Sequence, residues 1–88
     1  MNKIPLEAGR VVRSKSGRDQ GRLHVIISEI DSDFVLVANG TLRKLDRPKK
    51  KRRKHLSATE HRMDTDAWPP ENHQIAKLLK ALDPKEEG

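Results

Sequence analysis

Apolar and polar residues alternate along the first half of this chain, as they do in β-strands, and follow a helical period only near the C-terminus. Residues 9–15 mix β-branched and long polar side chains, a pattern that predicts a half-buried strand. Residues 22–30 give the strongest strand pattern, with apolar side chains on both faces. Two apolar faces are expected where a small barrel is filled inside and covered outside by other parts of the chain.

Turn residues separate the strand segments. Gly17 and Gly21 flank a polar loop after the first strand, and the turn at residues 31–33 leads into a strand over residues 34–38. The pair Asn39-Gly40 tolerates positive φ and predicts a tight hairpin to a returning strand over residues 41–45. Short strands with tight turns and no helical pattern between them predict a mainly β fold with a small antiparallel barrel over residues 9–47.

The pattern changes after the predicted barrel. Pro48 cannot donate to a sheet ladder, and the six basic residues that follow repel one another, so residues 48–66 are predicted to form a basic and irregular linker. Residues 67–84 are expected to contain a short C-terminal α-helix, which has an apolar stripe at positions i, i+3, i+4 and i+7. The stripe consists of Ile75, Leu78, Leu79 and Leu82. So short a helix needs a packing surface, either on the barrel or on another molecule. Residues 1–8 are expected to be a lead-in, and residues 85–88 a disordered tail.

Composition and charge narrow the classes of function. Only 33% of the 88 residues are hydrophobic and 36% are charged, so an apolar core is expected for only part of the chain. The sequence has no cysteine and no long apolar run, which favours a cytoplasmic protein without disulfides or membrane spans, and a monomer is the default. Residues 47–54 hold seven basic and no acidic residues, although the net charge of the whole chain is only +6. This concentration of charge predicts a polyanionic partner.

Two segments resemble a known family. Residues 9–22 resemble a KOW motif, with Gly21 at the position of its hallmark glycine. Residues 9–56 are similar to large-subunit ribosomal proteins of the archaeal and eukaryotic "fourteen-e" type, through the Gly-Arg-Val-Val opening, the Asn39-Gly40 turn and the Arg-Pro-Lys-Lys-Lys segment that begins at Arg47. The resemblance implies an SH3-like barrel of the KOW type and RNA binding in translation, with ribosomal RNA of the large subunit as the partner.

The candidate RNA-binding residues are all basic. The loop of the first predicted hairpin would fix the orientation of the protein on the RNA, Arg43 and Lys44 would extend the basic face, and residues 49–54 would supply most of the affinity by neutralising phosphates. The set is Lys15, Arg18, Arg22, Arg43, Lys44, Arg47, Lys49, Lys50, Lys51, Arg52, Arg53 and Lys54. Three alternatives remain open: the loop cations merely solvate a hairpin rim, or the basic run is a nuclear localisation signal, or it is a solvated charge run without a partner.

The remaining residues offer little other chemistry. Phe34 and Trp68 are the only aromatic residues; Phe34 is expected in the core and Trp68 as a cap on the barrel, which favours folded RNA bound through its phosphates over stacked bases. The histidine spacings fit no compact ligand pattern, so no metal and no cofactor are expected. No catalytic motif is present, which predicts a protein that is not an enzyme. The alternative function is a protein-interaction module of the transcription or translation machinery, using the barrel and the helix stripe.

Overall fold

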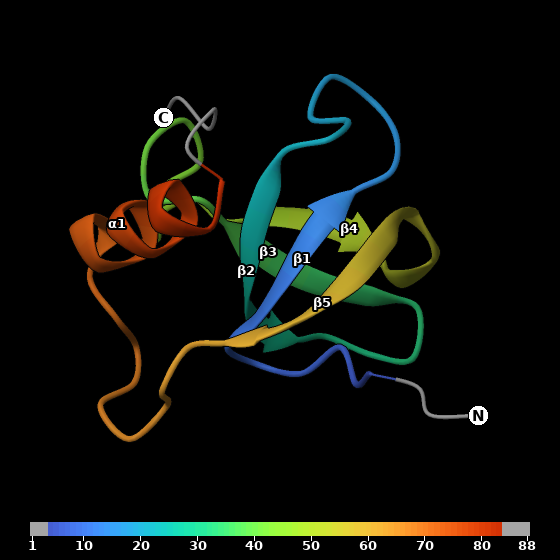
Figure 1. Cartoon of the computed structure of the whole chain (residues 1–88). Helices are drawn as coiled ribbons and strands as arrows, with labels where there is room; N and C mark the ends of the chain where they lie inside the picture. Colours follow the sequence, from blue (N-terminus) through green and yellow to red (C-terminus); the bar gives the residue numbers. More distant parts are fainter. Residues whose placement is uncertain (1–3, 84–88) are drawn as a thin grey trace.

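The alternating segments of the first half fold into three antiparallel strands, and two further strands complete a single sheet (Figure 1). The structure is a computed structural model, and it describes residues 4–83. The elements are β1 (Arg10–Ser14), β2 (Leu23–Glu29), β3 (Phe34–Ala38), β4 (Lys49–Arg52), the 3-10 helix η1 (Arg53–His55), β5 (Leu56–Arg62) and α1 (Asn72–Leu82). The strand order is β4-β3-β2-β1-β5, every pair of neighbours is antiparallel, and the sheet is open with β4 and β5 at its edges. The predicted mainly β fold with a C-terminal helix is therefore confirmed.

The sheet is apolar on both faces, as the pattern of β2 predicted. One face holds a cluster of fully or almost fully buried side chains, which are Val12, Ile26, Val35, Val37 and Leu56. The other face is covered by α1 and holds a second cluster, made of Val11, Leu23, Val25, Ala38, Ile75 and Leu79. Such a two-sided core buries much apolar surface in a chain with few hydrophobic residues, because β1, β2 and β3 each contribute to both clusters.

The predicted returning strand over residues 41–45 is wrong, because this segment belongs to a wide loop between β3 and β4. The side chain of Asn39 closes the loop: its Oδ1 accepts hydrogen bonds from the backbone amides of Thr41 (3.0 Å) and Arg43 (2.8 Å). The amides of Asn39 and Gly40 both donate to the carbonyl of Arg43. The asparagine therefore organises the loop through its side chain, instead of forming a two-residue hairpin turn.

The predicted irregular linker over residues 48–66 is also wrong, because it contains β4, η1 and β5. Pro48 immediately precedes β4, where its missing amide costs no ladder hydrogen bond. Repulsion within the basic run is limited because successive side chains of a strand point to opposite faces. In β5, Leu56 enters the core and the Thr59 hydroxyl donates to the carbonyl of Val11 (2.7 Å). Both segments form because they pair with buried strands.

The helix α1 is shorter than the predicted segment 67–84, but its predicted apolar stripe packs on the sheet. Glu71 caps the helix in a capping box with Gln74, so the backbone amides of both residues find acceptors within the first turn. Ile75 and Leu79 are buried, while Leu78 and Leu82 are partly buried against the same cluster. The stripe thus covers the protein's own sheet. Residues 85–88, predicted to be disordered, lie outside the described residues.

Trp68 packs on the cluster between α1 and the sheet, and its Nε1 donates to the carbonyl of Ile27 (3.3 Å). This position agrees with the expectation that Trp68 covers the core. None of the helices within residues 4–83 has the length and apolar character needed to cross a membrane.

Candidate nucleic-acid interface

The edge strand β4 divides the basic run between its two faces. Lys49 and Lys51 lie opposite Val37 and Val35 in the ladder with β3, so they share the inner face of the sheet with the core. Lys50 and Arg52 lie on the outer face, with Arg52 directly opposite Phe34. The run is therefore an ordered strand with two different sets of cations.

The inward cations attach the β1–β2 loop to β4. The Lys49 ammonium lies 2.8 Å from a carboxylate oxygen of Asp19, and this hydrogen bond holds the pKa of Asp19 below its usual value. The Lys51 side chain is buried, with its Nζ 3.4 Å from the carbonyl oxygen of Ser16, and burial lowers the pKa of its ammonium. The amide of Lys15 also donates to the carbonyl of His55 in η1. The loop, β4 and η1 thus form one connected unit.

The outward cations face solvent. Lys50, Arg52 and Lys54 are exposed, and none of their side chains makes a hydrogen bond or a salt bridge with another described residue. Arg53 differs, because its guanidinium donates to Glu29 (2.9 Å) and to the backbone carbonyls of Leu6 and Asp31 (both 3.0 Å). Three of the six basic residues at positions 49–54 therefore bind other parts of the protein, namely Lys49, Lys51 and Arg53.

The β1–β2 loop adds two exposed cations to this unit. Lys15 and Arg18 are exposed, whereas Arg22 is partly buried. Gly17 and Gly21 have φ angles of 77° and 86°, in the left-handed region that glycine enters more readily than other residues. A Cβ at either glycine would meet no atom within 4 Å, so the backbone conformation alone explains the residue type.

The loop between β3 and β4 holds the remaining candidates, Arg43, Lys44 and Arg47, and it is anchored on α1. The amide of Leu45 donates to the side chain of Asn72 (2.8 Å), and Gly40 packs directly on the first turn of the helix. In Figure 1 this loop lies beside α1, on the far side of the molecule from η1. The structure therefore separates these three cations from the group of Lys50, Arg52 and Lys54.

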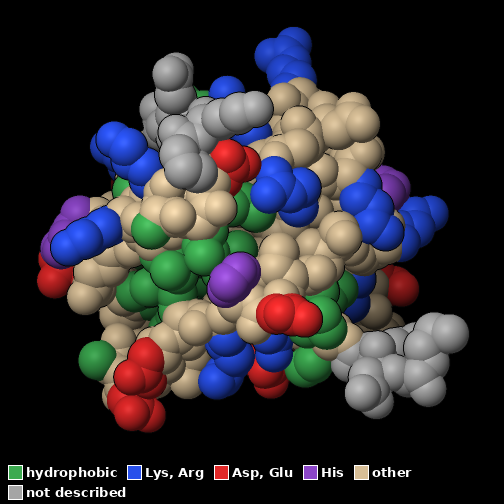
Figure 2. Space-filling view, in the orientation of Figure 1, with side chains coloured by type: hydrophobic (Ala, Val, Ile, Leu, Met, Phe, Trp, Pro, Cys, Tyr) green, Lys and Arg blue, Asp and Glu red, His purple; other side chains and the backbone are tan. Residues whose placement is uncertain are grey.

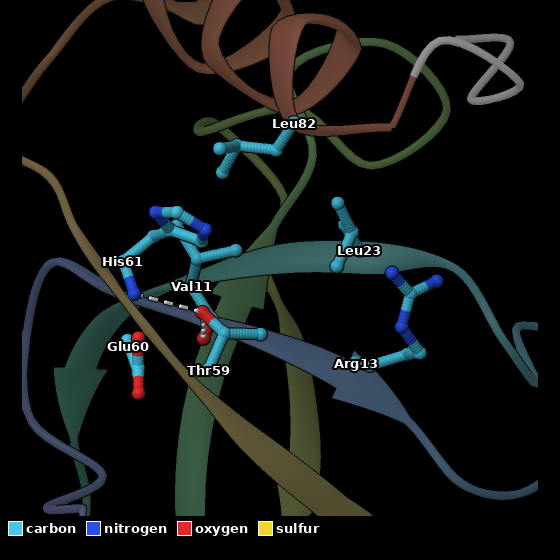
Figure 3. Close-up of a pocket in the computed structure, with 7 residues that line it drawn as sticks. All are labelled: Val11, Arg13, Leu23, Thr59, Glu60, His61 and Leu82. Atoms are coloured by element: carbon cyan, nitrogen blue, oxygen red, sulfur yellow. Dashed lines mark hydrogen bonds between the residues drawn. The ribbon is translucent and has the colours of Figure 1, made fainter.

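A hollow of about 190 Å³ lies between β1, β5 and the end of α1 (Figure 3). It is lined by Val11, Arg13, Leu23, Thr59, Glu60, His61 and Leu82. Two of the polar side chains at its wall bind other parts of the protein: Arg13 donates to the carbonyl of Gly21 and to the carboxylate of Asp83, and Thr59 donates to the carbonyl of Val11. Between residues 4 and 83, no three histidine or acidic side chains lie close enough together to hold a metal ion.

Three residues near the interface were not singled out by their sequence pattern as parts of it. Asp19, the only acidic residue in the loop, binds Lys49, and its isolation among cations was a usable signal. Phe34 was expected in the core, but it is partly exposed and belongs to neither core cluster. His24 is 1% exposed with its Nδ1 unpartnered, and burial lowers the pKa of its imidazole.

On the face drawn in Figure 2, apolar side chains gather where α1 meets the sheet, and lysine and arginine side chains lie around the periphery.

Comparison of the sequence with the known protein families and with curated proteins of known function found no match.

Proposed function

We propose that this protein is a non-catalytic RNA-binding protein that holds RNA phosphates and associates with the ribosome through ribosomal RNA. The observation that supports the proposal best is the state of Lys50, Arg52 and Lys54, whose side chains are exposed and form no salt bridge with residues 4–83. Exposed cations on the consecutive ordered elements β4 and η1 fit a phosphate backbone, which carries regularly spaced negative charges. Lys15 and Arg18, in the loop attached to β4, are further exposed cations.

We further propose that the sheet is an SH3-like barrel of the KOW type. Strands β1 to β4 pair in succession, and β5 returns to pair with β1. A sheet whose last strand returns to its first, and whose interior is filled by Val12, Ile26 and Leu56, curls toward a barrel. The resemblance of residues 9–56 to KOW-type ribosomal proteins supports the same assignment.

The binding mode follows from the chemistry of the exposed set. Lysine and arginine contact phosphate oxygens irrespective of sequence, so the affinity depends on salt more than on base identity. Each neutralised phosphate contributes about −0.7 to −0.9 to the slope of log K against log salt concentration. Three contacts from β4 and η1 therefore contribute about −2 to −3 to this slope.

The experiment is co-sedimentation of the tagged protein with ribosomal particles from cell lysate, at low and at moderately high salt. The test variant is Lys50→Gln/Arg52→Gln, and the matched control is Lys77→Gln/Lys80→Gln on the exposed side of α1. Both pairs lower the net charge from +6 to +4, so a difference between them reports position and not total charge.

We expect the wild-type protein and the control to sediment with the large subunit, with less protein bound as salt rises. The test variant is expected to stay largely at the top of the gradient, because it lacks the outward cations. The proposal is contradicted if the wild-type protein does not sediment with ribosomal particles at either salt concentration, or if both variants lose binding equally.

A further inference from the structure

The outer face of the sheet is only partly covered by α1. Phe34, Leu36 and Ala38 point to the same face of β3, because they alternate along the strand. Ala38 is buried in the cluster under α1, whereas Phe34 and Leu36 are partly exposed and belong to neither core cluster. The far end of β3 thus presents an aromatic ring at the surface, next to the outward side of β4.

Two cations lie on this ring. The Nζ of Lys50 is 4.3 Å from the centroid of the Phe34 ring, and the Cζ of Arg52 is 4.9 Å from it. Both distances fall within the range of cation–π contacts, and neither cation forms an ion pair within the described part of the chain. The ring therefore orders two charged side chains that remain available to a ligand.

The backbone that carries the ring is fixed. The amide of Phe34 donates to the Asp31 carboxylate (2.8 Å), which also accepts from the amide of Asp33 (2.8 Å). These two bonds hold the pKa of Asp31 below its usual value, so the residue stays charged beside the site. The Asp31 carboxylate repels a phosphate placed directly beside it, whereas it does not repel a neutral nucleobase.

We propose that Phe34, Arg52 and Lys50 form a subsite for one unpaired nucleotide of RNA. The nucleobase stacks on the Arg52 guanidinium, which itself lies over the Phe34 ring, and the Lys50 ammonium binds the adjacent phosphate. Aromatic rings and guanidinium planes both stack on bases, and every base offers a π-face, so the subsite selects unpaired RNA without selecting its sequence. This inference rests on the proposed RNA-binding function and adds to it a preference for loops and bulges.

The test compares two single-stranded RNA oligonucleotides with the same number of phosphates, one of adenosines and one of abasic ribose units. We expect the wild-type protein to bind the adenosine oligonucleotide about five-fold to a hundred-fold more tightly, as stacking of one base would give. Phe34→Leu is expected to bind the adenosine oligonucleotide only as tightly as the abasic one, and to bind the abasic one as tightly as the wild-type protein does.

A second variant guards against a folding defect in Phe34→Leu. Phe34→Trp keeps a stacking surface, and we expect it to retain the preference and to show fluorescence quenching by the adenosine oligonucleotide. The wild-type protein, whose one tryptophan is Trp68, provides the background signal.

The outcomes separate the two proposals. If the wild-type protein binds neither oligonucleotide nor folded RNA, the proposed function itself is wrong. If the wild-type protein binds both oligonucleotides equally, or Phe34→Trp shows no quenching, the subsite is wrong while phosphate binding stands. Equal competition by polyglutamate and by the adenosine oligonucleotide would also overturn the subsite, because it would show a site for anions alone.

Discussion

Replacing Lys51 by methionine separates the structural part of the basic run from the part assigned to RNA. The lysine is 8% exposed and lies opposite Val35, which is fully buried. Its ammonium has one polar contact, the Ser16 carbonyl at 3.4 Å, and it lies near the like charge of Lys49. Burial disfavours the charged form, which is why the pKa of this ammonium is lowered. Methionine keeps the length of the side chain and removes the charge.

The expected change in the free energy of unfolding of Lys51→Met is the sum of two opposing contributions. Loss of the long hydrogen bond to Ser16 costs about 0.5 kcal/mol, the low end for such bonds. Removing a largely buried charge that has no close carboxylate partner of its own gains about 1–2 kcal/mol, the lower part of the range seen when buried ions are replaced by apolar residues. We therefore expect Lys51→Met to raise the stability by about 1 kcal/mol, and hence the Tm by about 4–8 °C for a domain of this size.

The assay pairs thermal unfolding with RNA binding over a salt series, and the matched control is Lys50→Met. Lys50 is exposed on the other face of β4, so its replacement should lower the salt slope of binding by about 0.7–0.9. Its effect on stability should stay below about 1 kcal/mol, the value of an exposed cation–π contact. A lower Tm for Lys51→Met, or an equal loss of salt slope in both variants, would refute the division of the run into inward and outward cations.

Three further predictions concern stability, each measured by urea unfolding. Gly40→Ala should lower the free energy of unfolding by about 2–3 kcal/mol, because φ is 82° and the new Cβ would collide with the backbone of α1. Gly17→Ala should lower it by only about 1 kcal/mol, because the space around Gly17 is open. Because burial lowers the pKa of His24, the unfolded state binds the proton better, so stability should fall as the pH drops below 6.5; His24→Phe should remove this part of the pH dependence. Ile75→Ala should lower the free energy of unfolding by about 2–5 kcal/mol, whereas Lys77→Ala, on the exposed side of α1, should leave it almost unchanged.

The elements that the sequence predicted well are those whose own side chains decide the structure. The two apolar faces of β2 and the apolar stripe of α1 each require a covering layer, and the structure supplies it. By contrast, β4 and β5 are edge strands with mostly polar side chains, so their periodicity is weak. They form because β3 and β1 offer unpaired backbone edges, and this tertiary effect outweighs local propensity.

The candidate site was predictable in its charge but not in its geometry. The basic run was evident in the sequence, yet the register that turns Lys51 inward and Lys50 outward depends on pairing with β3. Phe34 could not be placed at the surface either, because a strand residue with this alternation could face the core or the uncovered end of the sheet. The contact between Asp19 and Lys49 joins residues 30 positions apart, which no local pattern reveals.

An ordered basic strand binds differently from a flexible basic tail. A tail must lose conformational freedom when it meets RNA, at a cost of about 0.5–1.5 kcal/mol for each immobilised long side chain. Here the backbone of β4 is already paired with β3, and Lys50 and Arg52 already lie on the Phe34 ring. The inward cations contribute to this order because Lys49 and Lys51 connect β4 to the loop that presents Lys15 and Arg18. If the proposed function holds, the inward cations therefore help to fix the position of the cations assigned to RNA contact.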